Sequence, residues 1–136
     1  MDHEQARAFI RANHRAVLAT HRRDGGVQMS PVLAGVDGEE RVIISTRETA
    51  FKTHHLRRDP RASLCVQNDA FFGQWIQIDG TAEVLSLPEA LEPLVDYYRR
   101  VVGEHPDWAD YRAAMARERR VLLRLTIRHA GPDRRG

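Results

Sequence analysis

The sequence has one cysteine, one lysine and no long apolar run, and each scarcity excludes a class of structure. Cys65 has no partner for an internal disulfide, so we expect it to be a small core residue of a protein from a reducing compartment. No apolar stretch reaches the roughly 18 residues of a membrane span. The charged N-terminus is unlike a signal peptide. We therefore expect a cytoplasmic protein without a membrane partner.

The scarcity of lysine singles out Lys52. The chain contains 21 lysine and arginine residues, and all of them except Lys52 are arginine. Where basic positions are biased toward arginine, the remaining lysine is a candidate for a role that needs a compact ammonium group, such as contact with a phosphate. A solvated position on a helix surface is the alternative interpretation.

Length and charge limit the remaining possibilities. A chain of 136 residues is expected to form one domain, here residues 1–129, followed by a short polar tail, residues 130–136, that we expect to be loose. The formal net charge of +2 comes from scattered arginines. No basic stripe with a reading element accompanies them, so we expect no nucleic-acid partner.

Alternating apolar residues and turn signals predict five or six antiparallel strands. A sheet of this size hides its edges by closing on itself, which favours a small closed or split barrel. Gly80 is expected to mark a bulge or bend. Phe71 and Phe72, in a loop, indicate a dimer interface or a cofactor pocket. The expected strands cover residues 16–21, 27–36, 42–46, 61–68, 74–86 and 121–128.

Helical periodicity predicts four helices around this sheet. The first begins after an Asp2 cap, ends near His14 and plugs one end of the sheet. The second begins near Thr46, so that threonine hydroxyls and free backbone N–H groups in its first turn offer a phosphate site. Residues 86–89 have the spacing of a capping box before the third helix, and residues 106–117 form the fourth. We expect the apolar stripes of the last two helices to belong to the core.

The usual signatures of catalysis by side chains alone are missing. His54 and His55 are neighbours on a predicted helix and point about 100° apart, so they do not form a metal site. The sequence has neither the spacing of a Ser-His-Asp triad nor a phosphate-binding loop of the G-x-x-x-x-G-K-[ST] type. We therefore expect a cofactor to supply the chemistry, with the barrel orienting it.

Several stretches resemble one known family. They are residues 45–63, with a lysine followed by HLRRDPRAS, and the segments LATHRRDGGVQMSPV, QIDGTAEV and YYRRVVGEHPDWADYRAAM. Together they are similar to the superfamily of pyridoxamine 5'-phosphate oxidase, and specifically to its actinobacterial branch that uses the deazaflavin coenzyme F420. The resemblance implies a mainly β (α+β) fold, a six-stranded antiparallel FMN-binding split barrel with flanking helices. It also implies a homodimer with two cofactor sites at the interface.

The resemblance also implies the site residues. A phosphate cradle would be formed by Ser45, Thr46, Arg47, Thr49, Ala50, Phe51 and Lys52; the strand beside the cofactor ring contains Gln28, Ser30, Pro31 and Val32; and Gln74 and Trp75 of the second subunit would close the pocket. Many family members have a basic residue at the position of Ala50. Arg47 is one candidate substitute, and with F420 the charge could be shared by Arg22, Arg23, Arg57 and Arg58.

The implied activity is F420-dependent hydride transfer to a small conjugated substrate. No acid or base is assigned, and Ser30, or a water that it holds, is the only proton donor considered. One alternative is an FMN-dependent enzyme of the pyridoxamine phosphate oxidase type, which Ala50 disfavours. Another is a flavin- or haem-binding protein without turnover, in which His54, His55 or His129 would be an axial ligand.

Overall fold

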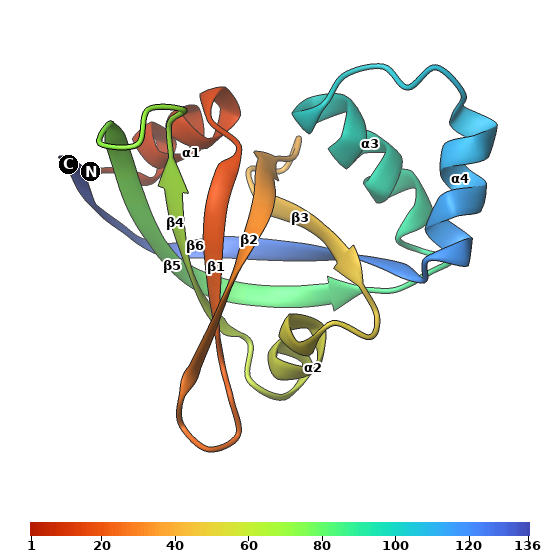
Figure 1. Ribbon diagram of the computed structural model, residues 1–136, viewed down its shortest axis with the longest axis horizontal. Helices are drawn as coiled ribbons and strands as arrows, with labels where there is room; N and C mark the ends of the chain where they lie inside the picture. The colour runs from red at the N-terminus through yellow and green to blue at the C-terminus, as the bar shows by residue number, and fades with distance from the viewer.

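Six antiparallel strands close into a barrel in the order β1-β2-β3-β6-β5-β4, as Figure 1 shows. The structure is a computed structural model that describes residues 1–136. Its elements are α1 (His3–Ala12), β1 (Arg15–His21), β2 (Val27–Val36), β3 (Val42–Arg47), α2 (Phe51–Arg58), β4 (Arg61–Gln67), β5 (Gln74–Leu85), α3 (Leu91–Val101), α4 (Trp108–Arg117) and β6 (Arg120–Arg135). The predicted six-stranded barrel with flanking helices is confirmed.

The barrel interior is filled by the apolar residues that alternate along the strands. On β5, Ile76, Ile78 and Ala82 are buried, as the alternation predicted. β3 differs because Val42, Ile43 and Ile44 are all buried. One face of this strand lies against the barrel core and the other against helices, which explains its continuous apolar run.

α1 closes one end of the barrel, and its start follows the predicted pattern. The Asp2 side chain accepts from the Gln5 N–H at 2.7 Å, while the Gln5 side chain accepts from the Asp2 N–H, which completes a capping box. Ala6 and Ile10 are fully buried in the barrel core. The helix ends at Ala12, two residues before the expected end. Local sequence signals were sufficient here because the cap and the apolar stripe lie within one short segment.

α3 and α4 form a separate lobe beside β3 and β6, on the right in Figure 1. A second core lies between them and the strands, and it contains Tyr97, Tyr111 and Met115. The predicted capping box at residues 86–89 is wrong, because those residues form turns and α3 begins at Leu91 without a side-chain cap. The expectation that apolar residues of this helix belong to the core fails for Val102, which directly follows α3 and is 60% exposed, whereas Tyr97 is buried.

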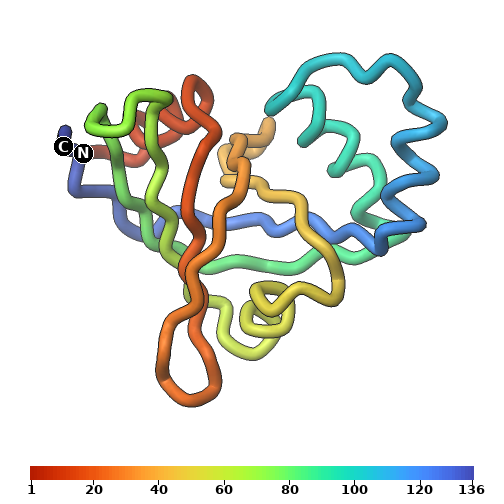
Figure 2. Tube along the Cα trace, viewed as in Figure 1, coloured from red at the N-terminus to blue at the C-terminus, as the bar shows by residue number.

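β5 and β6 pair over almost their whole lengths, with a shift in register between Asp79 and Gly80. This confirms the bend expected at Gly80, where an added Cβ would lie only 2.4 Å from the Thr126 carbonyl oxygen. The expectation of a loose tail at residues 130–136 is wrong. β6 continues to Arg135, which pairs with Gln74, so the domain boundary expected after residue 129 falls inside a strand of the barrel. The two termini therefore lie side by side (Figure 2).

Two further expectations need correction. Cys65 is not a core residue, because it alternates with buried Leu64 and Val66 on β4 and so lies half-buried on the outer face. The helix expected from Thr46 begins only at Phe51, since β3 extends through Arg47 and a turn follows. None of the four helices has the length and apolar character needed to cross a lipid bilayer.

Candidate functional site

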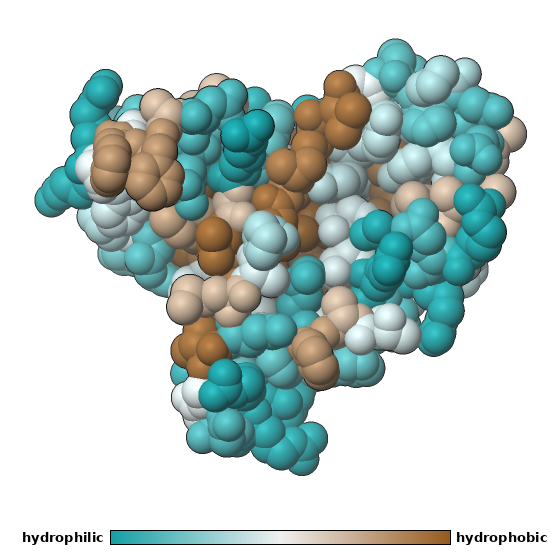
Figure 3. Space-filling model, viewed as in Figure 1, coloured by the Kyte–Doolittle hydropathy of each residue, from teal (hydrophilic) through white to brown (hydrophobic).

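A cleft opens where β2 and β3 separate. The two strands pair only from Ala34 to Val36 with Val42 to Ile44, although both continue beyond these residues. The cleft has a volume of about 720 Å³ and lies between the barrel, α2 and the lobe of α3 and α4. Figure 3 shows apolar residues gathered in this hollow. Sixteen residues line it: Arg15, Ala16, Val17, Pro31, Val32, Leu33, Ser45, Thr46, Lys52, Gln67, Tyr97, Tyr98, Val102, Tyr111, Met115 and Arg120.

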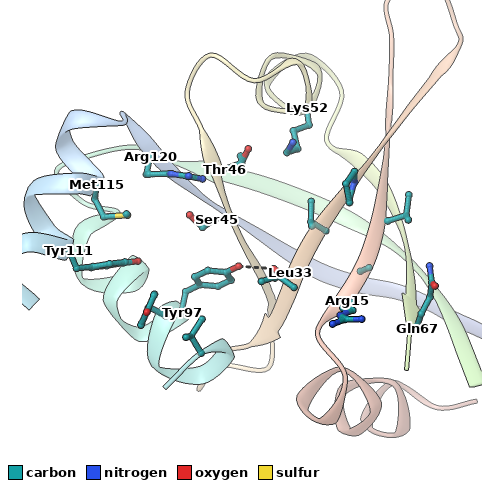
Figure 4. Close-up of a pocket in the computed structure, with 16 residues that line it drawn as sticks. Arg15, Leu33, Ser45, Thr46, Lys52, Gln67, Tyr97, Tyr111, Met115 and Arg120 are labelled. Atoms are coloured by element: carbon teal, nitrogen blue, oxygen red, sulfur yellow. Dashed lines mark hydrogen bonds between the residues drawn. The ribbon is translucent and has the colours of Figure 1, made fainter. Parts of the chain in front are cut away.

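Two cations meet at one end of the cleft. Lys52, in the first turn of α2, and Arg120, at the start of β6, both point into it (Figure 4). Lys52 has no carboxylate within ion-pair distance, and its pKa is lowered by burial and, secondarily, by the charge of Arg120. Arg120 contacts the Glu118 carboxylate at 2.9 Å. A half-buried ammonium without a counter-charge, next to a guanidinium, favours the binding of an anionic group.

Polar backbone and hydroxyl groups surround these cations. Ser45 and Thr46, at the end of β3, line the cleft on the side of Arg120. α2 begins at Phe51 after Ala50, which provides no side-chain cap, so the first N–H groups of the helix lack the usual hydroxyl or carboxylate partner. The Thr53 hydroxyl donates to the Arg47 carbonyl at 2.6 Å and is therefore committed to the fold. The expected threonine-rich first turn is thus reduced to Thr46, which lies on the strand.

The wall opposite the cations is apolar and comes from neighbouring strands. Pro31 on β2 lies directly across from Val17 on β1, and both line the cleft. Val32 and Leu33 continue this wall, and Leu33 is 45% exposed. Because Pro31 has no N–H to donate, the strand can face a ligand at this position without leaving a backbone donor unpaired. The wall is suited to a flat apolar group.

Tyrosines of α3 and α4 form the third side. The Tyr97 hydroxyl donates to the Leu33 carbonyl at 2.8 Å, and the Tyr111 hydroxyl donates to the Leu94 carbonyl at 2.9 Å. Burial raises the pKa of Tyr97 and raises that of Tyr111 to about 12. Both phenols therefore stay neutral hydrogen-bond donors at ordinary pH, and neither is set up as a base.

The structure brings together only part of the predicted site. Of the residues implied by the resemblance, five line the cleft: Pro31, Val32, Ser45, Thr46 and Lys52. Gln28 and Ser30 lie further along β2 and do not line it, although the buried Gln28 amide oxygen has no hydrogen-bond partner in the chain. Arg47 does not line the cleft, and its guanidinium lies 3.4 Å from Glu118. Ala50 and Thr49 lie in the connection before α2, and Phe51 is 70% exposed.

Gln74 and Trp75 lie elsewhere in the chain. They line a smaller cavity of about 270 Å³ together with Phe71 and Phe72, and Gln67 borders both this cavity and the cleft. The expected contribution of Gln74 and Trp75 therefore requires a second copy of the chain. Phe71 and Phe72 are 87% and 77% exposed, in agreement with the exposed loop that the sequence predicted.

Sequence reasoning missed Arg120, Tyr97 and Tyr111. Arg120 is the first residue of β6 and lies far from Lys52 along the chain, so nothing local connects the two. Tyr97 carried a usable signal, because a tyrosine beside an apolar helical stripe needs a partner for its hydroxyl when it is buried. That signal indicates a polar contact but not which strand supplies it.

The model of the family described as pyridoxamine 5'-phosphate oxidase matches residues 2–131. A conserved hypothetical protein from Mycobacterium tuberculosis is 25% identical, with a TM-score of 0.76 over 96% of this chain and 82% of that one.

Two solved structures with names that mention a ligand are more distant. A structure named F420 reductase is 17% identical, with a TM-score of 0.69 over 91% of this chain and 94% of that one. A heme binding protein from Mycobacterium smegmatis is 19% identical, with a TM-score of 0.71 over 98% of this chain and 57% of that one. At these identities the two structures support the fold alone.

Proposed function

Because the chain belongs to the pyridoxamine 5'-phosphate oxidase family, we propose that it is an oxidoreductase that uses coenzyme F420 to reduce a small conjugated substrate. The observation that carries the proposal is the cleft itself. Its apolar wall, formed with Pro31 and Val17, leads to the unpaired Lys52 and to Arg120. This combination suits a ligand with a flat ring at one end and a phosphate at the other.

Different residues of the cleft would bind the tail and the ring of such a ligand. Lys52 and Arg120 would bind the anionic tail, with hydroxyls of Ser45 and Thr46 nearby. Pro31 and the wall around it would orient the ring and exclude water from one face. When bound, the deazaflavin supplies a hydride to the substrate. None of the cleft side chains is an evident acid or base, so we assign no proton donor, and Ser30 lies outside the cleft.

FMN is the second candidate cofactor, and one observation favours it. The position of the missing basic residue, Ala50, was the argument against a phosphomonoester. Arg120 supplies a second cation beside Lys52 from a different element, which removes that argument. Haem is less well supported, because no histidine lines the cleft. His55 contacts the Thr20 hydroxyl at 3.0 Å, and His129 lies 3.5 Å from Asp79.

We also infer a homodimer from the outer face of the barrel. Met29 is 69% exposed, Leu33 is 45% exposed, and the Phe71–Phe72 loop adds two more exposed aromatic rings. Exposed apolar area of this kind is typical of a surface covered by a partner. A second copy placed there would bring its own Gln74 and Trp75 over the cleft, as the resemblance implies.

Ligand binding tests the proposal. Fluorescence titrations with F420, with its deazaflavin chromophore lacking the phosphate tail, with FMN, with riboflavin and with haem compare ring and tail directly. We expect F420 to bind with a Kd of about 10 µM or below, equivalent to roughly −7 kcal/mol, and its tailless chromophore to bind at least about tenfold more weakly. Tighter binding of FMN would transfer the proposal to a flavin enzyme. Binding of haem alone would contradict both.

A further inference from the structure

The ladder between β2 and β3 ends earlier than the strands do. Gly35 lies opposite Ile43, and in the same register Leu33 would lie opposite Ser45. That pair is not formed, although both residues are within their strands and both line the cleft. A neighbouring group therefore keeps β2 and β3 apart at this position, although the barrel is closed elsewhere.

The backbone groups of Leu33 and Ser45 are directed toward each other. The Ala34 N–H donates to the His14 carbonyl at 2.8 Å, so the hydrogen-bonding groups of Ala34 face β1. Successive residues of a strand direct these groups to opposite sides. The hydrogen-bonding groups of Leu33 and Gly35 consequently face β3. The next bond of the β2–β3 ladder would therefore join the Ser45 N–H to the Leu33 carbonyl.

The Tyr97 hydroxyl is found where that bond would form. It donates to the Leu33 carbonyl at 2.8 Å (Figure 4). The Ser45 N–H is directed at the oxygen of the Tyr97 hydroxyl itself, not at the Leu33 oxygen. We propose that the Tyr97 hydroxyl replaces one bond of the β2–β3 ladder and so holds the two strands apart, which sets the width of the cleft. As a statement about the ligand site, this inference rests on the proposed function.

α3 is fixed tightly enough for its tyrosine to act in this way. Gly35 has no side chain where α3 crosses β2, and a Cβ there would lie 2.9 Å from a methyl group of Val101. The Arg100 guanidinium donates to the Val36 carbonyl at 3.3 Å. The Tyr97 ring is 8% exposed and belongs to the second core. The hydroxyl is thus delivered by a helix that is anchored to β2 about one turn beyond the contact.

Removing the hydroxyl has a defined consequence. The Tyr97 hydroxyl lies between the Ser45 nitrogen and the Leu33 oxygen, whereas a direct bond would bring these atoms to about 2.9 Å. A buried N–H and C=O that have lost their partner are driven to pair with each other. The strands would then approach, and the cleft would narrow between its apolar wall and Thr46.

Tyr97→Phe tests the inference, with Tyr111→Phe as the matched control. Tyr111 also lines the cleft and donates to a backbone carbonyl, but its acceptor, Leu94, belongs to α3 and not to a strand. The first measurement is the NMR coupling transmitted through a hydrogen bond between the Ser45 nitrogen and the Leu33 carbonyl carbon. We expect no coupling in the wild-type protein or in Tyr111→Phe, and a measurable coupling in Tyr97→Phe.

The second measurement is the affinity for FMN. We expect it to fall at least about tenfold in Tyr97→Phe and by much less in Tyr111→Phe, which leaves the two strands as they are. A coupling between the Ser45 nitrogen and the Leu33 carbonyl carbon in the wild-type protein would overturn the inference, and this result does not depend on the folding of any variant. The absence of this coupling in folded Tyr97→Phe would overturn it as well. Coupling that appears without a change in affinity would overturn the link to the cleft. A wild-type protein that binds no cofactor would contradict the proposed function and leave the coupling result intact.

Discussion

Replacing Lys52 by methionine separates the role of its charge from its role in packing. Methionine keeps an unbranched side chain of similar length and removes the ammonium group. In the free protein this ammonium has no carboxylate partner. Its burial and the nearby charge of Arg120 both lower its pKa. Its removal therefore costs the free protein nothing in ion pairing. We expect the free energy of unfolding of Lys52→Met to equal or exceed that of the wild type.

Binding should change in the opposite direction. A charge-assisted hydrogen bond contributes about 1.5–3 kcal/mol, so the Kd for FMN or F420 should rise about 10- to 150-fold. Riboflavin, which has no phosphate, should bind equally to both proteins. For FMN, Arg58→Met is the control, because it removes a charge from the same helix outside the cleft, where its guanidinium donates to the His21 carbonyl. Equal losses in the two variants, or a loss for riboflavin in Lys52→Met, would refute the assignment of a phosphate site.

Four further predictions concern the pH dependence of Lys52 and the substitutions Arg120→Met, Gly80→Ala and Met29→Glu. The folded-state pKa of Lys52 lies below its ordinary value of 10.5, so the unfolded chain binds more protons at alkaline pH. The free energy of unfolding should therefore rise as the pH increases through the lowered pKa, while the affinity for FMN falls. Lys52→Met should show neither trend when unfolding and FMN fluorescence are measured across this pH range. Arg120→Met should weaken FMN but not riboflavin in calorimetry, by about tenfold. Gly80→Ala should lower the free energy of unfolding in urea by about 1–3 kcal/mol, because the added Cβ meets a backbone carbonyl of β6 at 2.4 Å; Gly38→Ala, whose nearest neighbour is a flexible arginine end at 3.4 Å, should have a small effect. Met29→Glu should convert a dimer to a monomer in sedimentation experiments, and a wild-type protein that sediments as a monomer would contradict the proposed interface.

Local patterns account for most of the secondary structure. The Asp2 cap, the alternation along β5 and the bend at Gly80 each depend on neighbouring residues, so they could be predicted. The errors occur where tertiary contacts prevail over local signals. The polar tail pairs with Gln74 because β5 offers it a free edge, and the capping box before α3 does not form although its residues have the correct spacing.

The residues of the site likewise differ in whether the sequence alone could identify them. Composition and periodicity are visible along the chain, so they were sufficient to predict a small barrel and to single out Lys52. The folded arrangement is needed to show that Arg120 lines the cleft and Arg47 does not, because both arginines contact Glu118 and their sequence positions do not distinguish them. Tyr97 likewise acquires its role only because α3 packs against a glycine on β2. Contacts between segments distant in sequence depend on how the strands close around the core, and no local pattern specifies that closure.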